Sequence, residues 1–316
     1  MEKKIKKILI LEGGYNEEHE VSLKTSREVK KILDFKNFKY KTLIVNPLSF
    51  KKDISKFKNY ICFNALHGPF GEDGQIQKIL KKNKLKFTHS NIKSSQLCFN
   101  KLKTKEIIIK NKILTPKFKI LNTVSIDINE LKKIKKRFGK FVIKPIKSGS
   151  SFGIKIIKNN KDLLNLSNDL LRFKKNLINH KFMLVEEYIA GKELTVSTIK
   201  IKNKVKALAV TEIKFKNSFF DYKSKYTKGY SNHILPAKLS NHNYNFCLDL
   251  AIKVHKILGC NSITRTDFIL GKKNKIYFLE TNTQPGLTRL SLLPEQALYK
   301  KISFEKIILE TIKQLN

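Results

Sequence analysis

Residues 265–286 read RTDFILGKKNKIYFLETNTQPG. Two mainly apolar runs separated by a short polar turn are typical of a β-hairpin. Residues two apart on a strand point to the same face, so Arg265 shares a face with Asp267, and Glu280 shares one with Asn282. Carboxylate and amide oxygens are ligands that suit Mg²⁺. The segment therefore predicts a hairpin on which Asp267, Glu280 and Asn282 bind metal ions and hold phosphate groups beside a cationic side chain.

A second candidate phosphate site follows Lys144, which ends an apolar run. The next residues, Ile146–Ser151, form a loop rich in glycine and serine, and a return strand is expected from Gly153. Backbone N–H groups in such a loop can surround phosphate oxygens. Because a strand follows and GxxxxGK[ST] is absent, this is not a P-loop. A flexible hairpin turn is the alternative interpretation, which the neighbouring evidence for a metal site disfavours.

The composition excludes several classes of protein. The chain has 316 residues, of which 41% are hydrophobic, and its apolar runs are far shorter than a membrane span. The apolar block Ile8–Leu11 is too short for a signal peptide and is expected to form a first strand. Four cysteines without paired spacing argue against a zinc site or a disulfide framework and favour a reducing compartment.

The formal net charge of +39 comes from 65 basic residues, of which only five are arginine. Nucleic-acid readers usually rely on arginine for bidentate contacts, so nucleic-acid binding is disfavoured as the main function. The charge should still attract anionic ligands such as ATP and make their affinities sensitive to salt.

Apolar periodicity predicts α/β and α+β organisation in three units: residues 1–99, 100–190 and 191–316. The first unit alternates strands with helices, which indicates a small parallel sheet. The long helices expected further along the chain span residues 126–138, 162–173 and 241–258. Residues 215–238 show no clear period, and long loops of this kind often act as lids.

Five separated motifs resemble the D-alanine–D-alanine ligase family of the ATP-grasp superfamily. They occur in the family's order, and the match that rests on them runs from Leu11 to Pro294, nearly the whole chain. The motifs are Gly13-Gly14 to Ser22, His67-Gly68 to Gly74, Lys144-Pro145 to Gly153, Asp221 to Tyr226, and Arg265-Thr266-Asp267 with Glu280 to Thr288. No GxSxG, HExxH or paired nucleophilic Cys and His is present, which agrees with chemistry based on positioning phosphate groups.

The resemblance implies a three-unit ATP-grasp architecture that begins with a Rossmann-like preATP-grasp unit, with a lid loop at 215–238. It implies an ATP-dependent ligase that forms D-alanyl-D-alanine through a D-alanyl phosphate, for peptidoglycan precursor synthesis. ATP as substrate, two Mg²⁺ ions (Mn²⁺ being possible), a homodimer and a cytoplasmic location follow from the same resemblance. No membrane or nucleic-acid partner is expected.

The resemblance also assigns roles to residues. Catalytic roles fall to Glu18, Ser150, Tyr226, Arg265 and Gly286. ATP contacts fall to Lys101, Lys144, Ser151, Glu186, Ile189, Glu193 and Lys225. Amino-acid contacts fall to His67, Ser291 and Leu292, and metal ligation to Asp267, Glu280 and Asn282.

Two alternatives stay open at this point. One is a related ligase that takes D-lactate or D-serine as the second substrate. Relatives that make the D-lactate ester often carry Phe where this chain has Tyr226, so the tyrosine favours an amine as second nucleophile. The other is an inactive relative, which the intact motifs disfavour. Small departures from the family's pattern, at Asn16, Asn100 and Leu287, remove no charged catalytic group.

Overall fold

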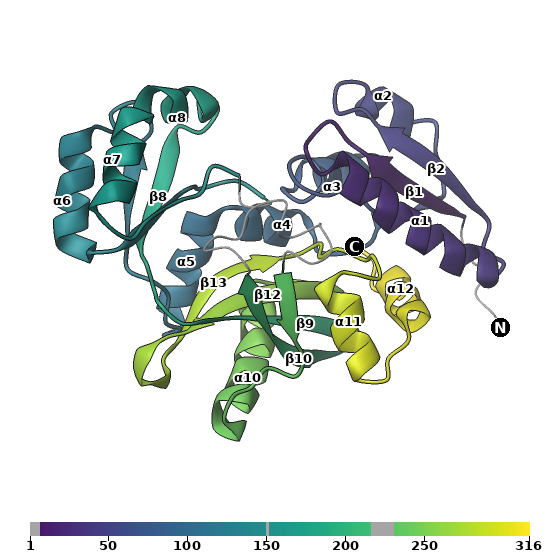
Figure 1. Ribbon diagram of the computed structural model, residues 1–316. Coiled ribbons are helices and arrows are strands. Elements are labelled where there is room, and N and C mark those ends of the chain that lie inside the picture. Colours follow the sequence, from purple (N-terminus) through teal and green to yellow (C-terminus); the bar gives the residue numbers. More distant parts are fainter. Residues whose placement is uncertain (1–6, 150–151, 216–230) are drawn as a thin grey trace.

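The computed structural model describes residues 7–149, 152–215 and 231–316. It contains three sheets, each in its own lobe (Figure 1). The strands and helices of the described residues confirm the mixed α/β and α+β organisation expected from the sequence. The unit boundaries at 99/100 and 190/191 stay a prediction. Among the described residues, no helix is long and apolar enough to cross a membrane.

The first sheet is parallel and has the strand order β2-β1-β3-β4. Its strands are β1 (Ile8–Gly13), β2 (Tyr40–Val45), β3 (Ile61–Asn64) and β4 (Lys86–Phe87), and its helices are α1 (His19–Phe35), α2 (Phe50–Ile54) and α3 (Gln75–Lys82). Every residue of β1 is buried, as expected for a central parallel strand covered on both faces. The predicted alternation of strands and helices is therefore confirmed.

The second sheet is antiparallel, in the order β5-β8-β6-β7. It comprises β5 (Phe118–Asn122), β6 (Phe141–Pro145), β7 (Lys155–Ile157) and β8 (Phe182–Glu187), with α6 (Ile128–Phe138), α7 (Asn160–Asn168) and α8 (Leu170–Asn176) packed on it. The prediction of one helix over 162–173 is wrong, because Asp169 ends α7 and precedes α8. Asn and Asp side chains compete for backbone hydrogen bonds and favour such breaks.

The third sheet is antiparallel, in the order β11-β10-β9-β12-β13. Its strands are β9 (Lys192–Ile201), β10 (Lys204–Phe215), β11 (Ser231–Ile234), β12 (Ile263–Leu270) and β13 (Ile276–Asn282). One face packs against α10 (Asn241–Ile257), with α4 (Ile92–Phe99) and α5 (Lys101–Lys110) contributing to the same core. The predicted hairpin at 265–286 is confirmed by the pairing of β12 with β13.

The prediction that residues 215–238 lack regular structure is wrong for Ser231–Ile234, which pair with the end of β10. This strand lies at the edge of the sheet and carries polar residues, so it has no alternating apolar pattern to detect. Residues 216–230 of the expected lid lie outside the described part of the chain.

The first and third units share a hydrophobic core. Helices α11 (Leu292–Tyr299) and α12 (Phe304–Lys313) bury apolar side chains in one cluster with β1 and α1. The last residue, Asn316, donates from its backbone N–H to the Phe87 carbonyl and from its side chain to the His89 carbonyl. Figure 1 shows α12 between the first lobe and the third sheet. The turns that follow β3 and β13 are thereby brought together.

Candidate active site

The β12–β13 hairpin places the four predicted residues in two cross-strand pairs. Arg265 lies opposite Asn282, and Asp267 lies opposite Glu280. A β-bulge follows Asp267, so that Phe268 pairs with Phe278 and Leu279 is the extra residue. The bulge reverses the alternation of faces. Phe278 therefore lies in the core beneath α10, while Glu280, two residues later, lies at the cavity.

Asp267 accepts hydrogen bonds from two neighbouring side chains. The Arg265 guanidinium donates to both of its carboxylate oxygens, at 3.0 Å from Nε and 2.8 Å from Nη2, and the Thr195 hydroxyl donates to Oδ1 at 2.6 Å. An ionised carboxylate offers about four lone-pair sites. Three are used among the described residues, which leaves room for one further ligand on Oδ2.

Lys101 begins α5 and turns its amino group toward the hairpin. Asn100 caps the helix by accepting from the Lys103 N–H, which fixes where Lys101 starts the first turn. Lys101 Nζ donates to the Ser148 carbonyl at 2.6 Å and lies 3.5 Å from Glu280 Oε2. Burial lowers the pKa of Lys101, and nearby Glu280 opposes this effect. One cation thus joins the glycine-rich loop to a predicted metal ligand.

Glu186 lies between two lysines. Its Oε2 is 2.6 Å from Lys144 Nζ, and its Oε1 is 2.8 Å from Lys105 Nζ. All three side chains are buried. Burial alone would raise the pKa of Glu186, but Lys144 and Lys105 hold it below its ordinary value. The carboxylate expected to receive adenine or ribose is therefore also the group that orients the predicted phosphate-binding Lys144.

Ile189 and Glu193 lie where the chain passes from β8 into β9. The crossing runs close to the turn between β12 and β13. A Cβ added at Gly191 would stand 2.1 Å from the Leu270 carbonyl oxygen, and one at Gly271 would stand 2.9 Å from Ile189 Cγ2. Glu193 pairs in register with Ile213 and Ile269 within the third sheet. Both predicted nucleotide contacts therefore lie at the junction of the second and third units.

Glu18, just before α1, is buried between two glycine loops. A Cβ at Gly68 would approach Glu18 Oε2 to 2.5 Å, and one at Gly149 would approach it to 3.0 Å. Gly68 also has a φ of +73°, which favours glycine. Asn16 binds the Gly68 loop by donating to the His67 and Pro69 carbonyls. The carboxylate thus stands where the first unit meets the glycine-rich loop of the second.

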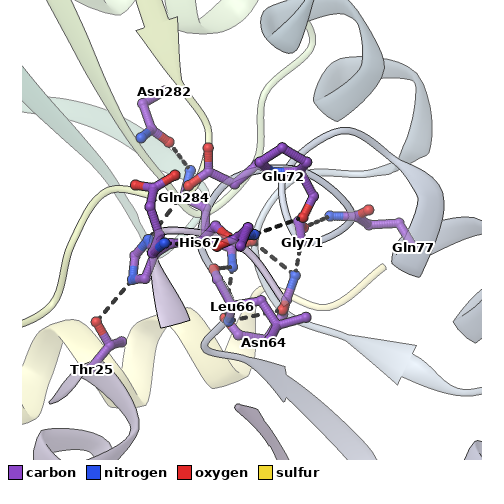
Figure 2. Close-up of polar contacts among 12 residues, drawn as sticks. Thr25, Asn64, Leu66, His67, Gly71, Glu72, Gln77, Asn282 and Gln284 are labelled. Atoms are coloured by element: carbon purple, nitrogen blue, oxygen red, sulfur yellow. Dashed lines mark hydrogen bonds and ion pairs between the residues drawn. The ribbon is translucent and has the colours of Figure 1, made fainter. Parts of the chain in front are cut away.

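His67 is held at both ring nitrogens. Nε2 lies 2.9 Å from the Thr25 hydroxyl, and Nδ1 lies 3.4 Å from Glu72 Oε1 (Figure 2). Burial, together with the nearby Glu18 carboxylate, raises the pKa of Glu72. The structure thus supplies His67 with a fixed orientation beside Glu18.

Gly286 and Ser291 come together in the turn before α11. A Cβ at Gly286 would stand 2.7 Å from Ser291 Oγ, so a larger residue there would displace the Ser291 hydroxyl. Ser291 Oγ lies 2.9 Å from the Thr288 hydroxyl and accepts from the Thr288 N–H. Leu292, the first residue of α11, is half-buried beside them.

A single cavity gathers residues from all three units. Its lining includes Glu18, Lys101, Gly149, Arg265, Glu280 and Asn282. Four further predicted residues, Ser150, Ser151, Lys225 and Tyr226, lie outside the described residues. Within the described ranges, no three His, Cys, Asp or Glu side chains form a metal-binding group, so the candidate metal site depends on the Asn282 amide as its third ligand.

Sequence reasoning missed four side chains that support this site: Lys105, Thr195, Glu72 and Gln284. Glu72 and Gln284 occur inside motifs that were recognised, but only the fold shows what they contact. Lys105 and Thr195 lie in segments with no motif. Their spacing along a helix or strand carried no signal, because their partners are distant in sequence.

Comparisons with known proteins show which family the chain belongs to. The family model described as "D-ala D-ala ligase C-terminus" matches residues 109–313. A D-alanine–D-alanine ligase of Pelagibacter ubique is 43% identical over 307 residues, covering 96% of each chain. One from Wolbachia pipientis wMel is 39% identical and covers 95% of this chain and 91% of the relative.

Solved structures give the same result. The crystal structure of a D-alanine–D-alanine ligase from Bacillus anthracis complexed with ATP superposes with a TM-score of 0.79 at 27% identity. The superposition covers 98% of this chain and 97% of the other. The similarity therefore extends over the first unit as well as the part matched by the family model.

Proposed function

Because this chain belongs to the D-alanine–D-alanine ligase family, we propose that it joins two D-alanine molecules into D-alanyl-D-alanine, with conversion of ATP to ADP and phosphate. The observation that carries the proposal is the cavity lined by Lys101, Glu280 and Arg265 together with Glu18. It combines groups suited to a polyanion with a carboxylate suited to an ammonium. The dipeptide would serve peptidoglycan precursor synthesis, as in the family.

The first step transfers the γ-phosphate of ATP to the carboxylate of one D-alanine. A carboxylate approaching a polyphosphate meets like charge, so the site must supply positive charge. Lys101 and Lys144 would contact the phosphates, with Lys144 oriented by Glu186. Glu186, Ile189 and Glu193 would hold the adenosine at the junction of the second and third units.

The oxygen donors of the hairpin fit Mg²⁺. Asp267 keeps one lone-pair site, Glu280 and Asn282 lie at the cavity, and Lys101 borders Glu280. Such hard, mixed carboxylate and amide donors are those that Mg²⁺ takes beside substrate phosphates. When bound, the metal ions would neutralise charge on the β- and γ-phosphates. Mn²⁺ has the same ligand preference.

The second step attaches the amine of the other D-alanine to the acyl phosphate, and phosphate leaves. Arg265 and the Gly286 N–H would stabilise the negative charge that develops on the carbonyl oxygen. Glu18 would bind the ammonium of the first D-alanine beside His67, and Ser291 and Leu292 would contact the carboxylate of the second. Ser150, Ser151, Lys225 and Tyr226 keep the roles that the family resemblance implies, and closure of 215–238 would exclude water.

A coupled ADP-release assay tests this function. With Mg²⁺ and ATP, release should require D-alanine and should be near background with L-alanine or no amino acid. Adding D-lactate or D-serine beside limiting D-alanine identifies any tolerated second substrate. Absence of ADP release with D-alanine would refute the proposal, and tight duplex binding above physiological salt would then favour a nucleic-acid function.

The metal assignment has its own test. Glu280→Gln should raise the Mg²⁺ concentration for half-maximal rate, because an amide replaces a charged ligand. Glu130→Gln, at a half-buried carboxylate paired with Lys119 on the second sheet, is the control and should leave the titration unchanged. Identical Mg²⁺ titrations for Glu280→Gln and the wild type would contradict the role of Glu280.

We also infer a homodimer in the cytoplasm from the family resemblance. Light scattering after gel filtration should give about twice the 36.7 kDa chain mass. A monomeric active enzyme would remove the dimer from the proposal without touching the ligase function.

A further inference from the structure

Two buried side-chain amides connect the first and third units. Gln284 follows β13, and Asn64 ends β3, 220 residues away in sequence. The Asn64 amide donates to Gln284 Oε1 at 2.9 Å, and Gln284 Nε2 donates to the Asn64 carbonyl at 3.2 Å and to the Leu66 carbonyl (Figure 2). We call the pair Asn64 and Gln284 the amide latch. Both side chains are at most 2% exposed.

The chemistry of the neighbours fixes which way each amide points. Gln284 Nε2 faces two backbone carbonyls, which can only accept, so this atom must be the nitrogen. Asn64 Nδ2 faces the Gly71 carbonyl at 2.9 Å as well as Gln284 Oε1, so it too must be the nitrogen. The network therefore has one orientation.

The latch joins two parts of the candidate active site. On one side, Asn64 and Gln284 hold Leu66 and Gly71, which bracket His67 and Gly68. On the other, the Gln284 backbone N–H donates to Asn282 Oδ1 at 2.6 Å, which orients a candidate metal ligand. No other residue in the described part of the chain makes both connections.

Resting on the ligase function proposed above, we propose that Gln284 is a positioning residue. It fixes the spacing between the amino-acid site at Glu18 and His67 and the metal site at Asn282. The latch holds the loop that carries His67, so its loss should displace the amino-acid site and weaken the binding of D-alanine more than that of ATP. ATP itself would bind between the second and third units, which the latch does not join.

The test is Gln284→Met, which keeps the length of the side chain and the backbone N–H but removes the three side-chain hydrogen bonds. The KM for D-alanine should rise on the order of tenfold, while the Kd for ATP measured without D-alanine stays within about twofold of wild type. A purely structural role would lower Tm and leave both constants unchanged.

Gln77→Met is the matched control. Gln77 is also a buried glutamine that donates to the Gly71 carbonyl, at 2.8 Å, but it stays within the first unit. It should lower Tm without the tenfold change in KM. Gln284→Asn, which is one methylene shorter, replaces Gln284→Met if that variant does not fold. It should likewise raise the KM for D-alanine while leaving the Kd for ATP close to the wild-type value.

Hydrogen exchange adds a readout that is independent of activity. Amides of residues 64–74 should exchange faster in Gln284→Met than in the wild type, while those of the second unit should not change. Unchanged exchange, a wild-type KM for D-alanine, or an equal KM rise in Gln77→Met would overturn the role of Gln284. A wild-type protein that is inactive with D-alanine would overturn the proposed function instead. In that case the hydrogen exchange of residues 64–74 would still test whether Gln284 holds this loop.

Discussion

At the scale of single residues, the Glu186 carboxylate is the least expected feature of the site. The sequence predicted a nucleotide contact, and the structure adds that Glu186 forms ion pairs with two buried lysines. Removing one member of a buried ion pair usually costs far more than the pair contributes, because it leaves an uncompensated charge. The three side chains should therefore respond to mutation as a unit.

Lys144→Ala should lower kcat/KM for ATP on the order of 10²-fold or more, because it removes a positive charge from the phosphate site and one partner from Glu186. Lys140→Ala, at an exposed lysine just before β6, is the control. Turnover of the two variants is measured by ADP release, and their affinity for ATP is measured by calorimetry. Normal turnover by Lys144→Ala would remove this lysine from the mechanism.

Lys105 predicts a pH dependence of stability. Burial lowers its pKa from 10.5 to about 8 in the folded protein, against the partial opposition of Glu186. The unfolded state therefore binds more protons between these values, and the contribution of Lys105 to the free energy of unfolding rises as pH increases from about 8 to about 10.5. Below about pH 8 the cost of burying the ammonium is fully present.

Urea unfolding of the wild type and Lys105→Met at pH 7 and pH 9.5 checks this sign. Lys105→Met should be destabilised at both values, because Glu186 loses a partner. The difference between the two proteins should grow at the higher pH. A difference that shrinks with pH would contradict the lowered pKa of Lys105.

At the scale of elements, the bulge and the crossing between β8 and β9 set the shape of the site. The bulge after Asp267 lets one strand place Phe278 in the core and Glu280 at the cavity. The crossing can approach the β12–β13 turn only because Gly191 lacks a side chain. Backbone geometry at two positions therefore decides where ligands and nucleotide contacts meet.

The two glycines of this crossing make a matched pair for mutation. Gly191→Ala places a Cβ against the Leu270 backbone oxygen, which cannot move alone, whereas Gly271→Ala meets side-chain atoms, Ile189 Cγ2 at 2.9 Å and the Tyr277 ring at 3.2 Å. Overpacking costs about 1–3 kcal/mol, so both substitutions should lower Tm, and Gly191→Ala should lower it by more than Gly271→Ala does. Equal effects of the two substitutions would contradict the difference between a backbone and a side-chain contact.

At the scale of the whole molecule, the net charge of +39 acts on ligands rather than on the fold. Exposed charges are screened beyond about 8 Å at physiological salt. The KM for ATP should rise several-fold between low and high KCl, while the KM for D-alanine, a zwitterion, should change little. Steady-state kinetics at two salt concentrations separate the effects, and parallel changes in both constants would argue against attraction of ATP by net charge.

Local pattern was sufficient for much of this protein. Apolar periodicity predicts the hairpin at 265–286 and the parallel first sheet. The spacing of polar residues on the hairpin predicts that Arg265 shares a face with Asp267 and that Glu280 shares one with Asn282. These features depend on neighbours in the chain, so the sequence carries them directly. The edge strand β11 and the break between α7 and α8 have no such periodic signal, and their prediction failed.

The sequence by itself determined which chemical groups are present and on which strands they lie, because strand alternation and motif spacing are local properties. Only the tertiary structure decided the pairing of Glu186 with two lysines, the enclosure of Glu18 by two glycine loops and the contact of Gln284 with Asn64. The Glu186 group joins α5, β6 and β8 within the second unit, and the other two contacts join residues from different units. The proximity of Gln284 to Asn64 arises from the shared core of α1, β1, α11 and α12, which no short stretch of sequence encodes.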